Sequence, residues 1–176
     1  MLNHVTTRII PVLLSALLLS CVSDKKDLFV RTLEEFDTAV QNLQPGDTLV
    51  LANGTWHDVE LRFMGSGTAE QPITLRAEDA GKVVISGQSN LALSGEYLVV
   101  RDLVFTAGHT PTTEVIAFRT AKDTLANHSR VTNTVIDDFT NPERFASDIW
   151  VAMYGKNNRF DHNSLLNKGN AGVTLA

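Results

Sequence analysis

The sequence predicts an all-β chain wound as a right-handed parallel β-helix, with a capping α-helix at its N-terminal side. Two observations favour this fold class. Short apolar segments follow one another closely along the chain and are separated by turns rich in glycine and asparagine, a pattern typical of strands. A hydrophobic pattern also recurs with a period near 30 residues, which in the absence of helices is typical of a solenoid.

The repeat consists of six-residue segments with apolar first and sixth places and a polar third place. The three segments begin 31 and then 29 residues apart, at Val100, Val131 and Phe160. Equivalent residues stack on successive coils of a parallel β-helix, so we expect these three side chains to lie above one another. The polar places are occupied by Asp102, Asn133 and His162, which we expect to form a hydrogen-bonded ladder. A jelly roll or sandwich is the alternative, but it requires longer strands with clean two-residue alternation.

The first residues have the features of a lipoprotein precursor. Residues 9–19 form a run of low polarity that is too short to span a membrane and is typical of a signal peptide. The segment at 18–21, Leu-Leu-Ser-Cys, resembles a bacterial lipoprotein processing site. We therefore expect a signal peptide at 1–20, lipidation of Cys21, and a location on the outer membrane, or else in the periplasm or outside the cell. A plain secretory signal is the alternative.

After a tether at 21–27, residues 28–176 are expected to form the β-helix. Thr32 and Glu35 fit a capping box, and apolar residues along one face predict a helix that ends near Leu43. Such a helix would cover the first coil, which otherwise exposes apolar side chains and unpaired backbone.

The remainder is expected to be strands and loops. The expected strands are residues 48–52, 59–63, 72–76, 83–86, 90–93, 97–105, 149–154, 159–166 and 172–176. Residues 53–56 are expected to turn. Residues 106–114 and 120–129 are expected to leave the coil as loops, which is where binding sites usually lie.

Composition limits the classes of function. The formal net charge is −5, from 15 basic and 20 acidic residues, and nucleic acid, which requires a basic face, is therefore not an expected partner. A polyanion would bind only through local groups of Lys and Arg. The sequence contains no Ser/His/Asp, phosphate-loop or zinc pattern, and the spacing of its carboxylates predicts no metal site.

Three segments, taken in order, resemble one family of polysaccharide-cleaving enzymes. They are TLEEFDTAVQNLQPGDTLVLANGTW, PITLRAEDAGKVVISG and VAMYGKNNRFDHNSLLNKGNAGVTLA. The third is the most specific, because the helix and the Pro-Gly-Asp turn of the first occur in many β-helix proteins. Residues 28–176 are similar to the N-terminal coils of polysaccharide lyase family 6, which contains chondroitinase B and alginate lyases. Residues 115–119 and 154–157 are more similar to the alginate-cleaving members.

The resemblance implies that the whole protein cleaves alginate by β-elimination, with dermatan sulfate as the alternative substrate. It also implies a Lys base, an Arg acid and a calcium site of Asn and Glu ligands on coils beyond residue 176, so no catalytic or metal-binding residue is assigned here. Family members are longer, and we expect this chain to be an N-terminal fragment, truncated at its C-terminus. A non-catalytic β-helix that holds polysaccharide at the cell surface is a hypothesis of a different class.

Four residues are candidate contacts for an anionic polysaccharide such as alginate. Lys156 and Arg159 bracket a tight turn and Lys168 lies between two expected strands. Lys168, Lys156 and Tyr154 could therefore line one end of a sugar cleft. His109 lies in an expected loop. Each has a structural alternative, because lysines in turns are usually solvated, a loop histidine is usually only exposed, and Tyr154 could pack against the neighbouring coil.

Overall fold

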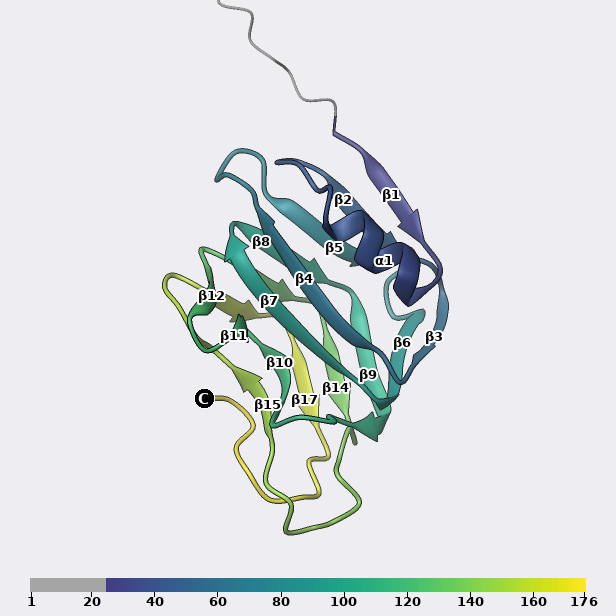
Figure 1. Ribbon diagram of the computed structural model, residues 1–176. Coiled ribbons are helices and arrows are strands. Elements are labelled where there is room, and N and C mark those ends of the chain that lie inside the picture. The colour runs from purple at the N-terminus through teal and green to yellow at the C-terminus, as the bar shows by residue number, and fades with distance from the viewer. Residues whose placement is uncertain (1–24) are drawn as a thin grey trace, which may run out of the picture.

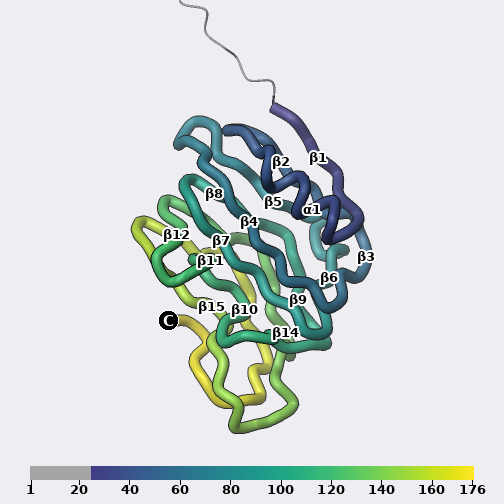
Figure 2. Tube along the Cα trace, viewed as in Figure 1, coloured from purple at the N-terminus to yellow at the C-terminus, as the bar shows by residue number. Residues whose placement is uncertain are grey.

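The computed structural model describes residues 25–176, which form a parallel β-helix of about four turns (Figure 1). The trace in Figure 2 follows the chain as it winds from the N-terminal side to the C-terminus. The predicted fold class is therefore confirmed. The expected signal peptide and Cys21 lie outside the described residues.

Each complete coil contributes one strand to each of three sheets. Sheet A contains β1 (Asp27–Val30), β2 (Thr48–Leu51), β5 (Ile73–Ala77), β8 (Leu98–Arg101), β13 (Arg130–Thr132) and β16 (Arg159–Asp161). Sheet B contains β3 (Gly54–His57), β6 (Val83–Gln88), β9 (Leu103–His109), β14 (Val135–Asp137) and β17 (Ser164–Leu166). Sheet C contains β4 (Glu60–Ser66), β7 (Asn90–Glu96), β10 (Glu114–Ala117) and β15 (Ile149–Ala152).

The core is made of in-register columns of apolar side chains. In sheet A, Val131 pairs with Val100 on one side and Phe160 on the other, as the repeat predicts. Sheet B contains an equivalent column, in which Phe105 pairs with Ile85 and Ile136. Stacking of like residues on successive coils removes the apolar surface of every coil except the first and last from water.

The polar residues of the repeat form the corner between sheets A and B. Asp102, Asn133 and His162 have φ values of 70°, 51° and 57°, a left-handed conformation that Asn and Asp adopt more readily than most residues. The expected ladder does not form. The Asp102 carboxylate instead accepts a hydrogen bond from Arg101 at 2.6 Å, and the His162 side chain is exposed. These residues are polar because the corner requires a positive φ.

This corner also explains two corrections to the expected strands. Residues 97–105 and 159–166 are each two strands that break at the left-handed residue, after β8 and after β16. Residues 172–176 contribute one isolated bridge, from Leu175 to Val151.

Three expected connections are wrong because they pair with neighbouring coils. The first part of the expected loop at 106–114 belongs to β9, in which His109 pairs with Gln88 of β6. The expected turn at 53–56 belongs mostly to β3, in which Trp56 lies in register with Ile85 of β6. The expected loop at 120–129 contains most of an antiparallel hairpin, formed by β11 (Arg119–Ala121) and β12 (Thr124–Asn127). The hairpin is held on the solenoid because β12 also pairs with β7.

The helix α1 (Leu33–Val40) covers the N-terminal end of the solenoid, beside β1 and β4 (Figure 1). Its capping box forms as expected, with the Thr32 hydroxyl accepting from the Glu35 amide at 3.2 Å and the Glu35 carboxylate accepting from the Arg31 amide at 2.7 Å. Phe36 is fully buried beneath the helix. Within residues 25–176, no helix is long and apolar enough to cross a membrane.

Successive coils are also joined by an ion pair between Arg130 and Asp161, which changes the pKa of the carboxyl group. Arg130 of β13 donates two hydrogen bonds to Asp161 of β16, at 2.7 and 3.0 Å. The hydrogen bonds from Arg130, together with the charges of Arg130 and Arg159, lower the pKa of Asp161 to about 2. Because the folded-state pKa is depressed, the pair stabilises the fold above the ordinary pKa of the carboxyl, and the contribution disappears as the pH falls towards 2.

We therefore expect Arg130→Met to raise the pKa of Asp161 towards its ordinary value near 3.8, as measured by NMR titration of the carboxyl carbon. Arg159→Met should raise it by less, because Arg159 contributes less to the shift than the hydrogen bonds from Arg130 do. Equal effects of the two variants would contradict this assignment.

Candidate substrate-binding site

The outward face of sheet C carries a column of small residues across its strands. Arg62 of β4 lies in register with Ala92 of β7, and Ala92 with Ala117 of β10. The column continues from Ala117 to Ala152 of β15. Their sequence neighbours Leu61, Leu93 and Ile116 are buried in the core, as alternation along a strand requires. The methyl side chains of Ala92 and Ala117 leave space above the sheet, whereas Ala152 is covered.

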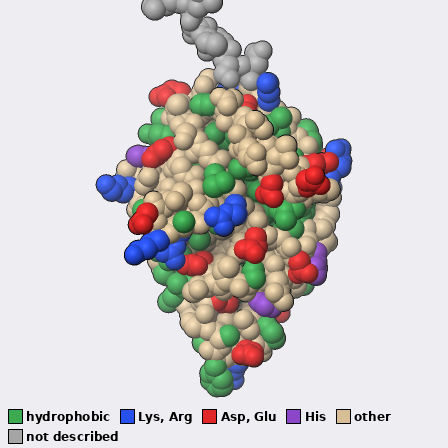
Figure 3. All heavy atoms as spheres, in the orientation of Figure 1, with side chains coloured by type: hydrophobic (Ala, Val, Ile, Leu, Met, Phe, Trp, Pro, Cys, Tyr) green, Lys and Arg blue, Asp and Glu red, His purple; other side chains and the backbone are tan. Residues whose placement is uncertain are grey.

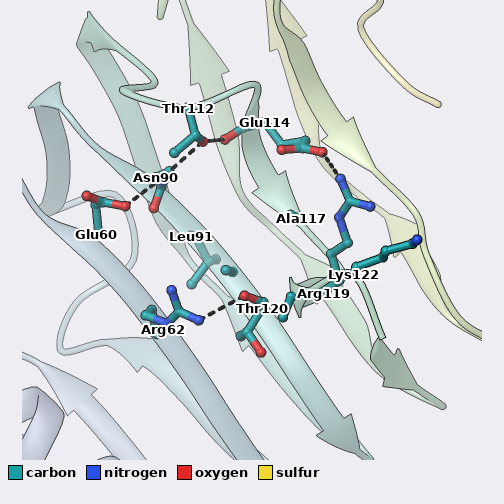
Figure 4. Close-up of a pocket in the computed structure, with 12 residues that line it drawn as sticks. Glu60, Arg62, Asn90, Leu91, Thr112, Glu114, Ala117, Arg119, Thr120 and Lys122 are labelled. Atoms are coloured by element: carbon teal, nitrogen blue, oxygen red, sulfur yellow. Dashed lines mark hydrogen bonds and ion pairs between the residues drawn. The ribbon is translucent and has the colours of Figure 1, made fainter. Parts of the chain in front are cut away.

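That space is a hollow of about 290 Å³ with two chemically different edges. One edge is formed by Glu60, Asn90, Thr112 and Glu114, and the other by Arg62, Arg119, Thr120 and Lys122 (Figure 4). The space-filling view in Figure 3 shows acidic and basic side chains interspersed over this side of the molecule, without a continuous basic patch. The hollow is therefore a place where hydroxyl-binding and anion-binding groups face each other.

Hydrogen bonds fix the acidic edge. The buried Asn90 donates from Nδ2 to the Glu60 carboxylate at 3.4 Å and to the Thr112 hydroxyl at 3.2 Å. Thr112 in turn donates to the Glu114 carbonyl at 3.2 Å. These residues come from β4, β7, and β10 with the connection before it, so three successive coils supply one edge.

The basic edge is held by the hairpin. Arg62 donates to the Thr120 carbonyl of β11 at 2.8 Å. Arg119 forms an ion pair with Glu114 at 2.6 Å and lies 3.8 Å from the centre of the Tyr154 ring. Lys122 lies exposed between β11 and β12. Because Arg119 is neutralised by Glu114, Arg62 and Lys122 are the cations that this edge presents to a ligand.

Tyr154, one of the four predicted contacts, supports this hollow from the side of β15. Its hydroxyl donates to the Glu114 carboxylate at 3.0 Å. Burial raises the pKa of Tyr154, and the hydrogen bond to Glu114 raises it further. The phenol therefore stays protonated at neutral pH and acts as a hydrogen-bond donor.

The other three predicted contacts lie elsewhere. Lys156 is exposed in the turn after β15, where its amide donates to Asn127 at 2.9 Å. His109 borders a separate hollow that also includes Thr140 and Arg144. The side chain of Lys168 is only 10% exposed and forms an ion pair with the buried Asp148. The structure thus brings only Tyr154 to the hollow on sheet C, and the substrate roles of Lys156, Lys168 and His109 stay predictions.

Comparisons with known proteins place this architecture among β-helical polysaccharide lyases. The sequence profile of the Chondroitinase B family matches residues 30–176. The chain therefore belongs to this family, polysaccharide lyase family 6. A comparison with curated protein sequences gives no match.

Three solved structures of this family are similar. The family 6 alginate lyase AlyGC is 57% identical, with a TM-score of 0.84, over 85% of this chain and 20% of its own. A mannuronic acid specific lyase from the human gut microbiota is 36% identical, with a TM-score of 0.77, over 85% of this chain and 36% of its own. The lyase Pedsa3628 from Pseudopedobacter saltans is 32% identical, with a TM-score of 0.76, over 81% of this chain and 32% of its own. The present chain thus spans a fifth to about a third of their lengths.

Proposed function

We propose that the protein to which this chain belongs is an alginate lyase that cleaves its polymer by β-elimination. The observation that carries the proposal is the 57% identity to an alginate lyase over 85% of the chain. In this proposal, residues 25–176 supply the first coils of the solenoid and a stretch of polysaccharide-binding surface on sheet C. The reaction itself takes place outside this range.

β-Elimination from a uronate requires three catalytic groups. The enzyme removes the proton on C5 of a uronate and expels the glycosidic oxygen at C4, so it needs a base at C5, an acid at O4 and neutralisation of the adjacent carboxylate. Calcium with oxygen ligands suits the last role. On the family resemblance, we place the calcium site of the whole protein beyond residue 176.

The proposed location is the cell envelope. We propose that Cys21 carries a lipid that anchors the protein to the outer membrane, with the solenoid following after the tether at 21–27. Mass spectrometry of the mature N-terminus tests this, because lipidation adds an acylated glycerol to the cysteine.

The test of function is the ultraviolet absorbance of the product. β-Elimination leaves a double bond conjugated to the uronate carboxylate, and we expect this absorbance to increase when the whole protein is incubated with alginate. Dermatan sulfate is the second candidate substrate, favoured by the name of the matching family, and a parallel assay compares the two polymers. Shortened chains without the new absorbance would indicate a hydrolase, and binding without cleavage of either polymer would indicate a non-catalytic β-helix.

A further inference from the structure

The hollow on sheet C has a floor that suits the face of a sugar ring. Ala92 and Ala117 are adjacent across β7 and β10, and both line the hollow. Its volume of about 290 Å³ lies near the lower limit for small-molecule sites, which are concave and have apolar floors with a few polar groups. Neighbouring strands lie about 4.8 Å apart, so a ring on this floor spans from one coil to the next.

The basic edge offers two cations that no carboxylate neutralises. Arg62 and Lys122 are exposed, and neither forms an ion pair with any group in residues 25–176. One guanidinium nitrogen of Arg62 donates to the Thr120 carbonyl, which fixes the side chain while its other N–H groups remain available. Arginine and lysine at such an edge bind a carboxylate through charge-assisted hydrogen bonds.

The opposite edge repels a carboxylate and attracts hydroxyl groups. Glu60 is exposed, and Asn90 fixes its carboxylate by donating to one oxygen. A carboxylate oxygen accepts hydrogen bonds from sugar hydroxyls, whereas a second carboxylate beside it is disfavoured. A ring that carries one carboxylate therefore has one preferred orientation across the hollow.

We propose that this hollow binds one uronate residue of an acidic polysaccharide, with the carboxylate at Arg62 and the ring hydroxyls at Glu60, Asn90 and Thr112. Lys122 lies at the other end of the same edge (Figure 4) and adds to the positive charge that attracts the polymer. The inference rests on the proposed function, because the hollow would be a polymer-binding subsite of the lyase that lies away from the reacting bond. The polymer crosses the strands over Ala92 and Ala117, from β4 towards β10.

The experiment compares two polymers that differ in the carboxylate alone: alginate, and alginate whose carboxyl groups have been reduced to alcohols. Binding of each to the full chain is measured by calorimetry, before and after the paired substitution Arg62→Gln, Lys122→Gln. The matched control is Arg31→Gln, Lys82→Gln, which changes the net charge equally. Arg31 lines a separate hollow beside β3 and Lys82 precedes β6 of sheet B, and neither residue lines the hollow on sheet C.

We expect the native chain to prefer alginate to the reduced polymer by about tenfold or more, as one or two charge-assisted hydrogen bonds predict. The Arg62, Lys122 variant should lose this preference and the control should keep it. Glu60→Gln should weaken binding of the reduced polymer severalfold. The substitution removes a charged acceptor of sugar hydroxyls, and the reduced polymer has no carboxylate whose repulsion by Glu60 would be relieved. Retention of the preference by the Arg62, Lys122 variant, or its absence from the native chain, would overturn the proposal.

The lyase assay separates this inference from the proposed function. If the whole protein cleaves alginate while the Arg62, Lys122 variant binds and discriminates like the native chain, the subsite is wrong and the function stands. If the preference depends on these two residues but the whole protein produces no unsaturated uronate, the function is wrong. Because the subsite lies away from the reacting bond, the Arg62, Lys122 variant of the whole protein should have a higher KM for long polymers and an unchanged kcat.

Discussion

Lys168→Met will lower the free energy of unfolding by about 3–5 kcal/mol, the cost typical of removing one partner from a buried ion pair. The substitution leaves the Asp148 carboxylate, whose side chain is 4% exposed, without its cation. The Lys168 ammonium also donates to Asn170 at 2.9 Å. The second carboxylate oxygen of Asp148 is buried and has no hydrogen-bond partner within residues 25–176, so no other contact compensates. Urea denaturation at neutral pH measures the loss.

Two further variants make this result specific. Asp148→Asn combined with Lys168→Met should recover much of the loss, because no buried charge then remains unpaired. Lys156→Met removes an exposed lysine and should change the stability by less than about 0.5 kcal/mol. If Lys168→Met weakened polysaccharide binding and left the stability unchanged, Lys168 would be a substrate contact, as its position in the sequence suggested.

The sequence predicted the solenoid because stacking imposes a repeat on the chain. A residue such as Val131 must be apolar when it lies between Val100 and Phe160, so the column appears as a period. The prediction of a hydrogen-bonded ladder at Asp102 was wrong because two different structural features favour the same residue types. A positive φ and a hydrogen-bonded ladder both favour polar residues, and composition alone does not separate the two.

The hollow on sheet C was much harder to predict. Arg62 and Ala92 are 30 residues apart but Ala92 and Ala117 are only 25 apart, because connections of different length separate the strands. A search at a constant offset therefore misses the column. Lys122 arrives through the hairpin, which long-range contacts such as the pairing of β12 with β7 place there. Tyr154 was identified because it belongs to the segment with the most specific family resemblance.

Gly95→Ala is expected to destabilise the fold by about 3 kcal/mol or more, since a positive φ and overpacking each cost one or more kcal/mol. Gly95 has a φ of 114°, and an added Cβ would lie 1.9 Å from the carbonyl oxygen of Gly65. Gly65 is its in-register partner in the pairing of β4 with β7. The obstacle is backbone, so no side-chain rotation relieves it, and the two coils must separate where sheet C turns towards sheet A.

Gly54→Ala is the matched control, because Gly54 has a similar φ of 126° and nothing lies within 4 Å of its added Cβ. Gly54→Ala should lower the free energy of unfolding only by the cost of a positive φ at a non-glycine residue, about 1–2 kcal/mol. The difference between the two variants in thermal or urea unfolding therefore measures the close approach of the coils at Gly95. Equal losses would mean that the left-handed backbone accounts for the whole effect. A larger loss for Gly95→Ala would mean that backbone contact sets the spacing of β4 and β7, the strands that carry Arg62 and Ala92.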